Sequence, residues 1–559
     1  MAHDLSMKVS FDANSQCYFA VNASVNDAVQ LTKLLWRPHP DAHGVWWTRS
    51  PYLAAPYWPC VAADDVATRN ALGWFAWNYQ TSFAREPLTG TGVDSIRIPA
   101  GEKPFPFQVA GVQRAVRQQR ILIADQPGLG KSLSSLVTAN ITRPERIVIG
   151  CPTMLVHNWA AECEKWLVDP RTISILDNPR KPVPDRGVII VPYSRGHTFA
   201  EKLLRGPKID HLILDEVHQL KNPTARRTAP WLSQSGVATS ASRVVALTGT
   251  PVMNNPLEIH SLLQVIAPDT VGQISRDKFK ELYCSTFKGT AKVARKGGGE
   301  ASVEFESNSG KNEDVLNAEL RASGVMIRRL KDDVLDQLPP KHVYLMHLTP
   351  TAAIEDLVRE EATLYEMLET KIMTSQELIA LQGHIMNVRQ RLGVLKAPKI
   401  AEYLMSIFEA GEDRVVCFML HLEPIDIIRK CFEHTRIKVR LMTGGQNPSV
   451  RQANVNAFQR PGGLELFLGQ FIAAGVGLTA TAARYCVVGE LPWTPAIADQ
   501  GIDRVHRISQ QRQVEAPIIA FPHSVEERVI RANAKKAISA YNILDVNLMK
   551  LATDMQLVA

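Results

Sequence analysis

The sequence predicts an α/β fold with two doubly wound parallel-sheet lobes, a helical insertion between them and a small α+β module at the N-terminus. Three observations lead to this prediction. Short apolar runs alternate with amphipathic segments between residues 105 and 268, the alternation resumes after residue 399, and residues 1–85 have a composition of their own. Strands rich in Val, Ile and Leu fit a sheet buried on both faces, and the helices between them complete a βαβ pattern.

The length and charge of the chain set outer bounds on this prediction. A chain of 559 residues is long enough for about three folded units. Its 63 Lys and Arg against 56 Asp and Glu give a net charge of +7, which permits a polyanionic partner without demanding one. The eight cysteines show no CxxC pair or zinc spacing. The N-terminus lacks a secretory signal and no apolar run is long enough to cross a membrane, so we expect a soluble, intracellular monomer with scattered, mostly buried thiols.

The N-terminal module, residues 1–85, holds six of the ten tryptophans. Alternation over residues 7–11 and the stretch 44–50 indicate strands, and Ser24 followed by Asp27 resembles a capping box that opens a helix over 25–35. The aromatic and basic side chains have two interpretations, a stacking platform for nucleic acid or the filling of a small core.

A linker, the first lobe and an insertion follow the N-terminal module in that order. Residues 86–104, rich in Gly and Pro, are expected to be a linker. The first lobe, 105–268, contains five candidate strands: 120–125, 146–151, 187–192, 211–216 and 243–249. The segment 269–398 is expected to be a helical insertion and inter-lobe linker, with a Gly-rich hairpin or loop over 287–311 and long helices over 352–395.

The second lobe, 399–559, repeats the alternation. Its candidate strands are 413–420, 438–444, 464–469, 485–491 and 514–521, and its candidate helices are 448–459, 496–509 and 525–544.

The strongest local signal is the stretch 121–136, ILIADQPGLGKSLSSL. Gly128 and Gly130 allow backbone N–H groups to face phosphate oxygens, and the helix that follows adds its positive N-terminal end. Lys131 would reach the β- and γ-phosphates of ATP, and the Ser132 hydroxyl would bind Mg²⁺. The strict loop pattern has a glycine where Asp125 stands, so the match is partial and an incidental turn is the alternative.

An acidic pair ends the candidate strand 211–216. Asp215 and Glu216 follow an apolar run, where carboxylates are costly unless they bind a metal or do acid–base work. Asp215 would hold Mg²⁺ opposite Ser132, and Glu216 would polarise the attacking water. The alternative is a strand end capped by solvated acids.

Two arginines carry the third signal. Arg504 and Arg507 are three residues apart, so on a helix they would share a face and serve as arginine fingers on the γ-phosphate. A solvated basic helix face is the alternative interpretation.

Taken together, these motifs resemble the Swi/Snf-type DNA translocases of helicase superfamily two, over roughly residues 105–528, and most resemble the HepA-related, annealing-helicase branch. The resemblance implies two RecA-like lobes. FPFQVAGV resembles the glutamine motif and implies that Gln108 contacts adenine. LTGTPVMNNPLEIHSLL resembles the coupling motif, and RRLKDDVLDQLPPK resembles the linker between lobes. ADQPGLGKS resembles the phosphate loop, so the implied nucleotide contacts are Ala124, Asp125, Gln126, Pro127, Gly128, Leu129, Gly130, Lys131 and Ser132.

The second lobe carries the remaining family motifs. AAGVGLTATAA resembles motif five, and WTPAIADQGIDRVHRISQ is similar to the family's last signature, with Thr494 in place of Asn and Ser509 in place of Gly. These motifs imply that Gly477 and Gln500 contact the nucleotide. The implied nucleic-acid contacts are Thr153, Lys221, Asn222, Gly475, Thr479 and Trp493.

The resulting prediction is an ATP- and Mg²⁺-dependent motor that moves on duplex or branched DNA without sequence preference. Two other functions stay open. One is a strand-separating DNA or RNA helicase with the same motifs, and the other is a DNA-binding adaptor with an inactive ATPase. The intact Lys131, Asp215, Glu216 and Arg507 argue against the adaptor.

Overall fold

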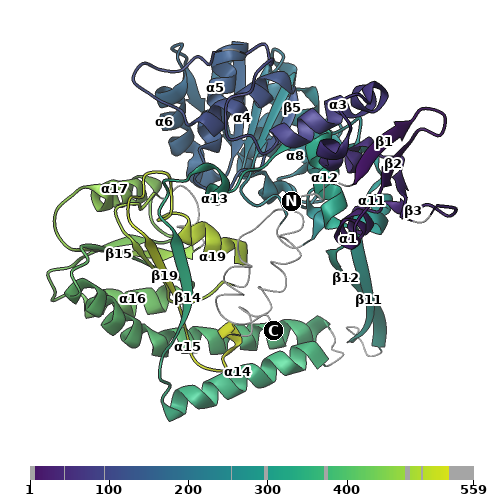
Figure 1. The fold of residues 1–559 in the computed structure, drawn as a ribbon. Helices are drawn as coiled ribbons and strands as arrows, with labels where there is room; N and C mark the ends of the chain where they lie inside the picture. The colour runs from purple at the N-terminus through teal and green to yellow at the C-terminus, as the bar shows by residue number, and fades with distance from the viewer. Residues whose placement is uncertain are drawn as a thin grey trace. The chain divides into compact units, whose positions relative to one another are not determined.

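The computed structural model describes residues 7–42, 44–93, 95–252, 255–294, 300–370, 375–471, 479–492 and 495–527 (Figure 1). The chain divides into two compact units. The first holds residues up to Ser285 together with Ser309–Val334, and the second holds Thr286–Asn308 and the described residues from Leu335 onward.

A four-stranded antiparallel sheet of order β1-β2-β4-β3 begins the first unit. Its strands are β1 (Lys8–Asp12), β2 (Cys17–Val21), β3 (Arg37–Pro38) and β4 (Trp46–Thr48). The predicted capping box is confirmed: Asp27 N donates to Ser24 Oγ (3.2 Å) and Ser24 N donates to Asp27 Oδ2 (3.0 Å) at the start of α1 (Val25–Lys33). The helices α2 (Pro51–Ala54) and α3 (Val66–Thr81) follow, separated by a 3₁₀ segment, Ala55–Cys60.

The first parallel sheet has seven strands in the order β13-β5-β10-β9-β6-β8-β7. The five predicted strands are confirmed as β5 (Arg120–Ile123), β6 (Arg146–Cys151), β8 (Gly187–Pro192), β9 (His211–Asp215) and β10 (Arg243–Leu247). Their central residues are almost all buried, as expected for strands covered on both faces. Two strands that the sequence did not indicate, β7 (Ile173–Ile175) and β13 (Met326–Ile327), complete the sheet.

Helices flank this sheet, as Figure 1 shows around β5. The strands of the sheet are contacted by α4 (Pro106–Arg117), α5 (Lys131–Thr142), α6 (Val156–Trp166), α7 (Gly196–Arg205), α10 (His260–Ile266) and α12 (Glu313–Ala322). The first unit also contains α8 (Ala229–Leu232), α9 (Val237–Ser240), α11 (Arg276–Tyr283) and α13 (Lys331–Val334). The predicted Gly-rich hairpin is confirmed as the two-stranded sheet of β11 (Cys284–Ala294) and β12 (Glu300–Gly310).

The second parallel sheet has six strands in the order β14-β19-β18-β15-β17-β16. They are β14 (Lys341–His347), β15 (Arg414–Met419), β16 (Lys438–Met442), β17 (Glu465–Gln470), β18 (Tyr485–Val488) and β19 (Val514–Ala520). Two lobes with buried parallel sheets confirm the predicted RecA-like α/β architecture.

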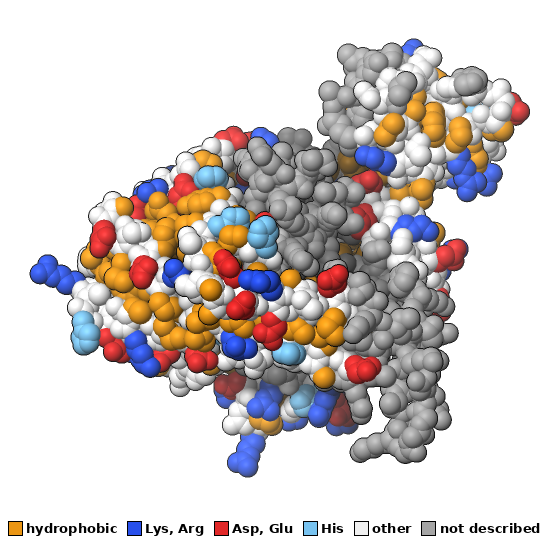
Figure 2. Space-filling model, turned by 90° about the horizontal axis from the view of Figure 1, so that it is seen from below, with side chains coloured by type: hydrophobic (Ala, Val, Ile, Leu, Met, Phe, Trp, Pro, Cys, Tyr) orange, Lys and Arg blue, Asp and Glu red, His pale blue; other side chains and the backbone are white. Residues whose placement is uncertain are grey.

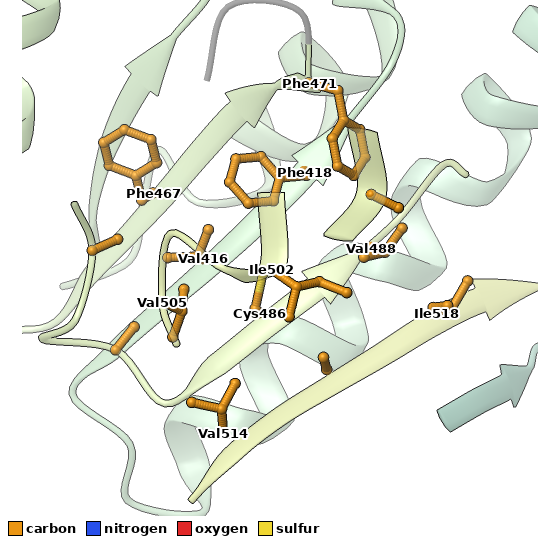
Figure 3. Close-up of a cluster of buried hydrophobic side chains, with 14 of the residues drawn as sticks. Val416, Phe418, Phe467, Phe471, Cys486, Val488, Ile502, Val505, Val514 and Ile518 are labelled. Carbon is orange, nitrogen blue, oxygen red and sulfur yellow. The ribbon is translucent and has the colours of Figure 1, made fainter. Parts of the chain in front are cut away.

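Two long helices, α14 (Ala352–Thr370) and α15 (Ser375–Glu409), form the predicted helical insertion and lie side by side. The helices α16 (Leu422–Cys431), α17 (Pro448–Gln459) and α19 (Pro495–Ile502) complete the described part of the second unit. The core on one face of its sheet combines aromatic and aliphatic side chains from several strands and α19, including Phe418, Phe467, Phe471 and Ile502 (Figure 3).

One helix prediction is wrong in its extent. The sequence indicated a helix over 496–509, but α19 ends at Ile502 and turns follow. The Arg504 carbonyl, which a continuing helix would use internally, accepts a hydrogen bond from Ala480 N at 2.9 Å. The predicted helix over 525–544 lies almost wholly outside the described residues.

The mixture of charges on the surface and the burial of the cysteines agree with what the composition predicts. On the face drawn in Figure 2, Lys and Arg side chains are interspersed with Asp and Glu side chains. Six of the eight cysteines are buried, which confirms mostly buried thiols. Of the helices in the described ranges, none combines the length and apolar character needed to cross a membrane.

Candidate nucleotide site

The loop between β5 and α5 has the backbone of a phosphate-binding loop. Gly128 and Gly130 have φ values of +91° and +81°, in the left-handed region that favours glycine. A Cβ at Gly130 would collide with the side-chain amide of Gln108, which itself donates to Leu129 O at 3.0 Å. The N-cap residue of α5 is Gly130, and among the described residues no side chain caps this end, so the first N–H groups are available to an anion.

Lys131 is the first residue of α5, and its ammonium group lies against the loop. Nζ donates to Asp125 O at 2.8 Å and to Gln126 O at 3.3 Å. Burial lowers the pKa of Lys131, partly offset by the carboxylates of Glu216, Asp125 and Asp215. Ser132 follows and is half-buried. A cation surrounded by carbonyls and carboxylates fits a site that exchanges these contacts for phosphate oxygens.

The acidic pair lies at the carboxyl end of β9, and its side chains are mostly buried, with that of Glu216 17% exposed. Asp215 accepts hydrogen bonds from Trp159 Nε1 (2.8 Å) and from Glu216 N (2.9 Å). Burial, followed by the neighbouring Glu216 charge, raises the pKa of Asp215 to about 7. The alternative of a strand end capped by solvated acids is therefore wrong. A buried carboxylate with a raised pKa fits the addition of a cation, which would restore its charged form.

A histidine links the acidic pair to the predicted coupling motif. His218 Nδ1 lies 3.0 Å from Thr248 Oγ1 and 3.2 Å from Glu216 Oε2. Thr248 Oγ1 also accepts from Thr250 N at 3.1 Å. Gly249 packs so closely on the phosphate loop that a Cβ there would lie 2.7 Å from Pro127 Cγ. The first unit thus brings together the predicted adenine, phosphate, acidic and coupling segments.

Sequence reasoning missed two buried arginines in this site. Arg328 Nη1 donates to Ala124 O and to Gly249 O, and Arg329 forms a buried ion pair with Asp125. The pair RR at 328–329 is visible in the sequence, where it forms part of the predicted inter-lobe linker. The Asp125 carboxylate is 1% exposed and accepts hydrogen bonds from Arg329, so the nucleotide contact implied for this residue would come from its backbone.

The predicted nucleic-acid contacts of the first unit lie near the surface. Thr153 Oγ1 lies 2.9 Å from Ser194 Oγ, and Lys221 Nζ lies 2.8 Å from Glu258 Oε1. Asn222 is exposed. Their role in binding DNA stays a prediction. Gly475, Gly477 and Trp493 lie outside the described residues.

Arg504 and Arg507 occupy turns after α19 rather than one helix face. Arg507 Nη1 donates to Thr479 Oγ1 at 2.7 Å, so two predicted site residues meet. Arg504 is 6% exposed and Gln500 is 8% exposed. The interpretation of a solvated basic face is therefore wrong for Arg504, whereas the arginine-finger role stays a prediction.

The outer face of the N-terminal sheet presents an aromatic pair flanked by arginines. Phe19 pairs with Trp47 across β2 and β4, and Trp47 pairs with Arg37 across β3 and β4, so all three share a face. The guanidinium groups of Arg37 and Arg49 lie 5.7 and 5.9 Å from the Trp47 ring centroid. Of the module's six tryptophans, only Trp36 is fully buried. The six tryptophans therefore differ in their environments, and neither a stacking platform nor the filling of a small core accounts for all of them.

Two parallel-sheet lobes, together with two family models that match the chain, define a protein of helicase superfamily two. The SNF2-related domain matches residues 67–399, and the helicase conserved C-terminal domain matches residues 396–509. Because the first match spans more than half of the chain, the chain belongs to the SNF2-related family, and this membership implies the use of a nucleotide.

Two curated relatives illustrate the similarity. The chain is 28% identical to mouse DNA annealing helicase and endonuclease ZRANB3 over 75% of its own length and 39% of the relative's. It is 30% identical to the bovine SWI/SNF-related matrix-associated actin-dependent regulator of chromatin subfamily A-like protein 1, over 73% of its own length and 41% of the relative's. The chain thus spans about two fifths of these relatives.

A solved structure of the Sulfolobus solfataricus SWI2/SNF2 ATPase core in complex with dsDNA matches 82% of this chain and 98% of that chain, at 19% identity and a TM-score of 0.34.

Proposed function

We propose that the chain is a DNA-dependent ATPase that moves on duplex or branched DNA inside the cell. One observation carries the proposal: within the first unit, a loop turned by Gly128 and Gly130 brings Lys131 to the start of α5, and Asp215 ends β9 of the same parallel sheet. That combination of cation, acids and helix N-terminus fits the hydrolysis of a bound nucleotide. Membership of the SNF2-related family supports the same reaction.

Each group of the first unit has a distinct task in this proposal. The loop N–H groups and Lys131 bind the phosphates, and Gln108 reads adenine. Ser132 and Asp215 hold Mg²⁺, which when bound offsets the charge of the phosphates. Glu216 orients the attacking water and accepts its proton.

The second unit supplies Arg504 and Arg507, which stabilise charge on the transferred phosphoryl group. The planar guanidinium suits this task because it bonds two oxygens at once. Thr479 accepts a hydrogen bond from Arg507 and is itself a predicted DNA contact, so it would link the arginine to the DNA. Gln500 and Gly477 are proposed as further nucleotide contacts.

The DNA substrate is supported by the names of the relatives, which include a DNA annealing helicase. Backbone phosphates would be contacted near Thr153, Lys221, Asn222, Gly475, Thr479 and Trp493, which makes binding independent of sequence and sensitive to salt. The outer face of the N-terminal sheet, with Phe19, Trp47 and Arg37, would stack exposed bases where a branched substrate provides them.

The domain division of the sequence analysis is part of the proposal: an accessory module (1–85), a linker (86–104), the first lobe (105–268), an insertion with linker (269–398) and the second lobe (399–559). A monomer is proposed as the working form.

The experiment that tests the proposal compares ATP turnover with no nucleic acid, single-stranded DNA, duplex DNA, a fork and RNA. Strongest stimulation by duplex or fork is the expected result. Stimulation by single strands or RNA alone would favour the strand-separating or RNA-acting alternative. No turnover with any of these would favour the adaptor.

A further inference from the structure

The phosphate loop is hydrogen-bonded to the chain that leaves the first unit. The pairing of β5 with β13 continues past both strands, since Ala124 N donates to Ile327 O at 2.8 Å and Gln126 N donates to Arg329 O at 3.1 Å. Among the described residues, the first unit ends at Val334, which is the last residue of α13. The loop and the outgoing chain therefore form one continuous piece of structure.

Two consecutive loop residues connect Lys131 to that outgoing chain. The carbonyl oxygens of Asp125 and Gln126 both accept from Lys131 Nζ, at 2.8 and 3.3 Å. Their side chains bond the outgoing chain instead: Asp125 Oδ1 accepts from Arg329 N at 3.0 Å, and Gln126 Oε1 accepts from Lys331 N at 2.7 Å. A movement of Lys131 toward a phosphate would release the two carbonyls and disturb both connections.

The Asp125–Arg329 ion pair is the strongest of these connections. Arg329 donates to both carboxylate oxygens of Asp125 and to Phe107 O, and both side chains are 3% exposed or less. Arg329 also packs on α4, since a Cβ at Gly111 would lie 2.6 Å from its Nη2. Burying an ion pair costs desolvation that a hydrophobic pair avoids, so stability alone is a weak reason for it. The pair also gives a physical reason for an aspartate where the strict loop pattern has glycine.

We propose that Asp125 and Arg329 are positioning residues that couple nucleotide occupancy of the phosphate loop to the segment 326–334 leading out of the first unit. The inference rests on the proposed function, because it requires that the loop binds a nucleotide. It goes further by assigning a communication role to two residues that do not touch the reacting atoms.

The first test is hydrogen–deuterium exchange of the wild-type chain with and without Mg²⁺-ADP, with ADP binding measured in parallel by calorimetry. ADP is expected to change the exchange rate of the amides in 326–334 by roughly 2- to 30-fold, the range of measured coupling effects. Binding of ADP without any change in this segment overturns the coupling. Absence of ADP binding overturns the proposed function itself, and the coupling with it.

The second test uses Asp125→Asn and Arg329→Lys, which keep the size and polarity of each side chain but weaken the bidentate pair. Both variants are expected to keep ADP affinity within a few-fold, lose the ADP-dependent exchange change, and lower kcat with duplex DNA more than they raise KM. Arg114→Lys is the matched control, since Arg114 is a buried arginine of α4 that bonds Asn78 and Gly324 rather than the loop.

A merely structural role for the pair predicts a different result. Both variants would then exchange faster to the same extent with and without ADP, and the ADP-dependent change would survive, which overturns the proposal. If neither variant folds, as judged by circular dichroism, the exchange measurement on the wild-type chain decides alone.

Discussion

The two units share one layered plan but use buried charge in different places. In the first unit, one set of buried charged groups surrounds the loop between β5 and α5, where Asp125 pairs with Arg329 and Asp215 ends β9. In the second unit, buried charges attach the helical insertion to the sheet. Lys396 of α15 donates to Gly489 O (3.0 Å) and Ile519 O (2.9 Å), at the carboxyl edge of β18 and β19.

This difference indicates that similar α/β sheets place their buried charged groups for different purposes, a reaction site in one unit and the attachment of helices in the other. Each sheet has polar groups at its carboxyl edge, as parallel α/β sheets generally do. The first unit uses that edge for groups with the properties of a reaction site, whereas the second uses much of it to hold α14 and α15. Substitutions around the phosphate loop of the first unit are therefore expected to act on turnover. Substitutions in the second-unit network, which comprises the buried pairs Lys396–Glu526 and Arg389–Glu361, are expected to act on stability.

The largest effect is expected from Lys131→Ala. Lys131 is a loop contact rather than part of the apolar core, so the variant should fold and yet lose ATP turnover almost completely, because Lys131 is the loop cation that the proposal places on the phosphates. Steady-state ATPase assays with duplex DNA measure this. Lys165→Ala is the control, since Lys165 is half exposed on α6 of the same unit. Turnover near the wild-type rate would contradict the nucleotide-site assignment.

Glu216→Gln is expected to lower hydrolysis by about 10²–10⁴-fold while ATP still binds. The substitution keeps the shape of the side chain but removes the carboxylate that, in the proposal, accepts a proton from water. Single-turnover hydrolysis and nucleotide binding should be measured on the same preparation. Loss of nucleotide binding in a folded variant would instead indicate a structural role for Glu216.

Arg507→Ala extends the comparison to the second unit. It is expected to keep most ATP affinity and to lose DNA-stimulated turnover by about 10²–10³-fold, because the proposal has the Arg507 charge act on the transition state rather than on the bound nucleotide. Arg507→Lys should restore little, since a point charge does not reproduce the planar fork. Near-normal stimulation in Arg507→Ala would contradict the arginine-finger assignment.

Much of the first site could be predicted because its signals are local. The phosphate loop, Lys131 and the acidic pair each stand next to an apolar strand, so a short window of sequence contains both the element and the functional group. The Asp125–Arg329 pair could not be found in this way. Its members are 204 residues apart, and β13, the strand that aligns them, has only two residues.

The end of α19 shows a second limit of sequence reasoning. Residues 496–509 have a helical pattern, but tertiary hydrogen bonds end the helix early. His506 Nε2 lies 2.8 Å from Pro339 O, and Gln510 Nε2 donates to Ala483 O at 2.7 Å. Such contacts come from distant segments, so local periodicity does not reveal them.

A smaller effect is expected from Trp47→Ala in the N-terminal sheet. If the outer face stacks exposed bases, fork binding should weaken by about tenfold while basal ATP turnover stays unchanged, since one base–aromatic stack contributes about 1–3 kcal/mol. Fluorescence anisotropy with a labelled fork measures the change. Trp74→Ala is the matched control, because Trp74 is 52% exposed on α3 and lies outside that sheet. Equal binding by both variants and the wild type would favour a packing role for Trp47.

The smallest effect on activity is expected from Glu361→Gln, which tests whether the second-unit network acts on stability. Glu361 of α14 is 1% exposed and accepts from Val525 N at 3.1 Å, a bond that Gln can keep. Burial, followed by the charge of Glu526, raises the pKa of Glu361 to about 7. A raised pKa means that the folded state favours the protonated form, so this contribution to stability is complete below about pH 4.5 and is lost as the pH rises toward 7.

Glutamine does not titrate. As the pH rises from 5 to 8, the free energy of unfolding of Glu361→Gln should therefore increase by up to about 3 kcal/mol relative to that of the wild type. Native-state hydrogen exchange of the β15 amides, corrected for intrinsic rates, measures this gain. Glu355→Gln on the exposed side of α14 is the control, because its carboxylate is 53% exposed. Parallel stability curves for Glu361→Gln and the wild type would contradict the raised pKa and remove this distinction between the two units.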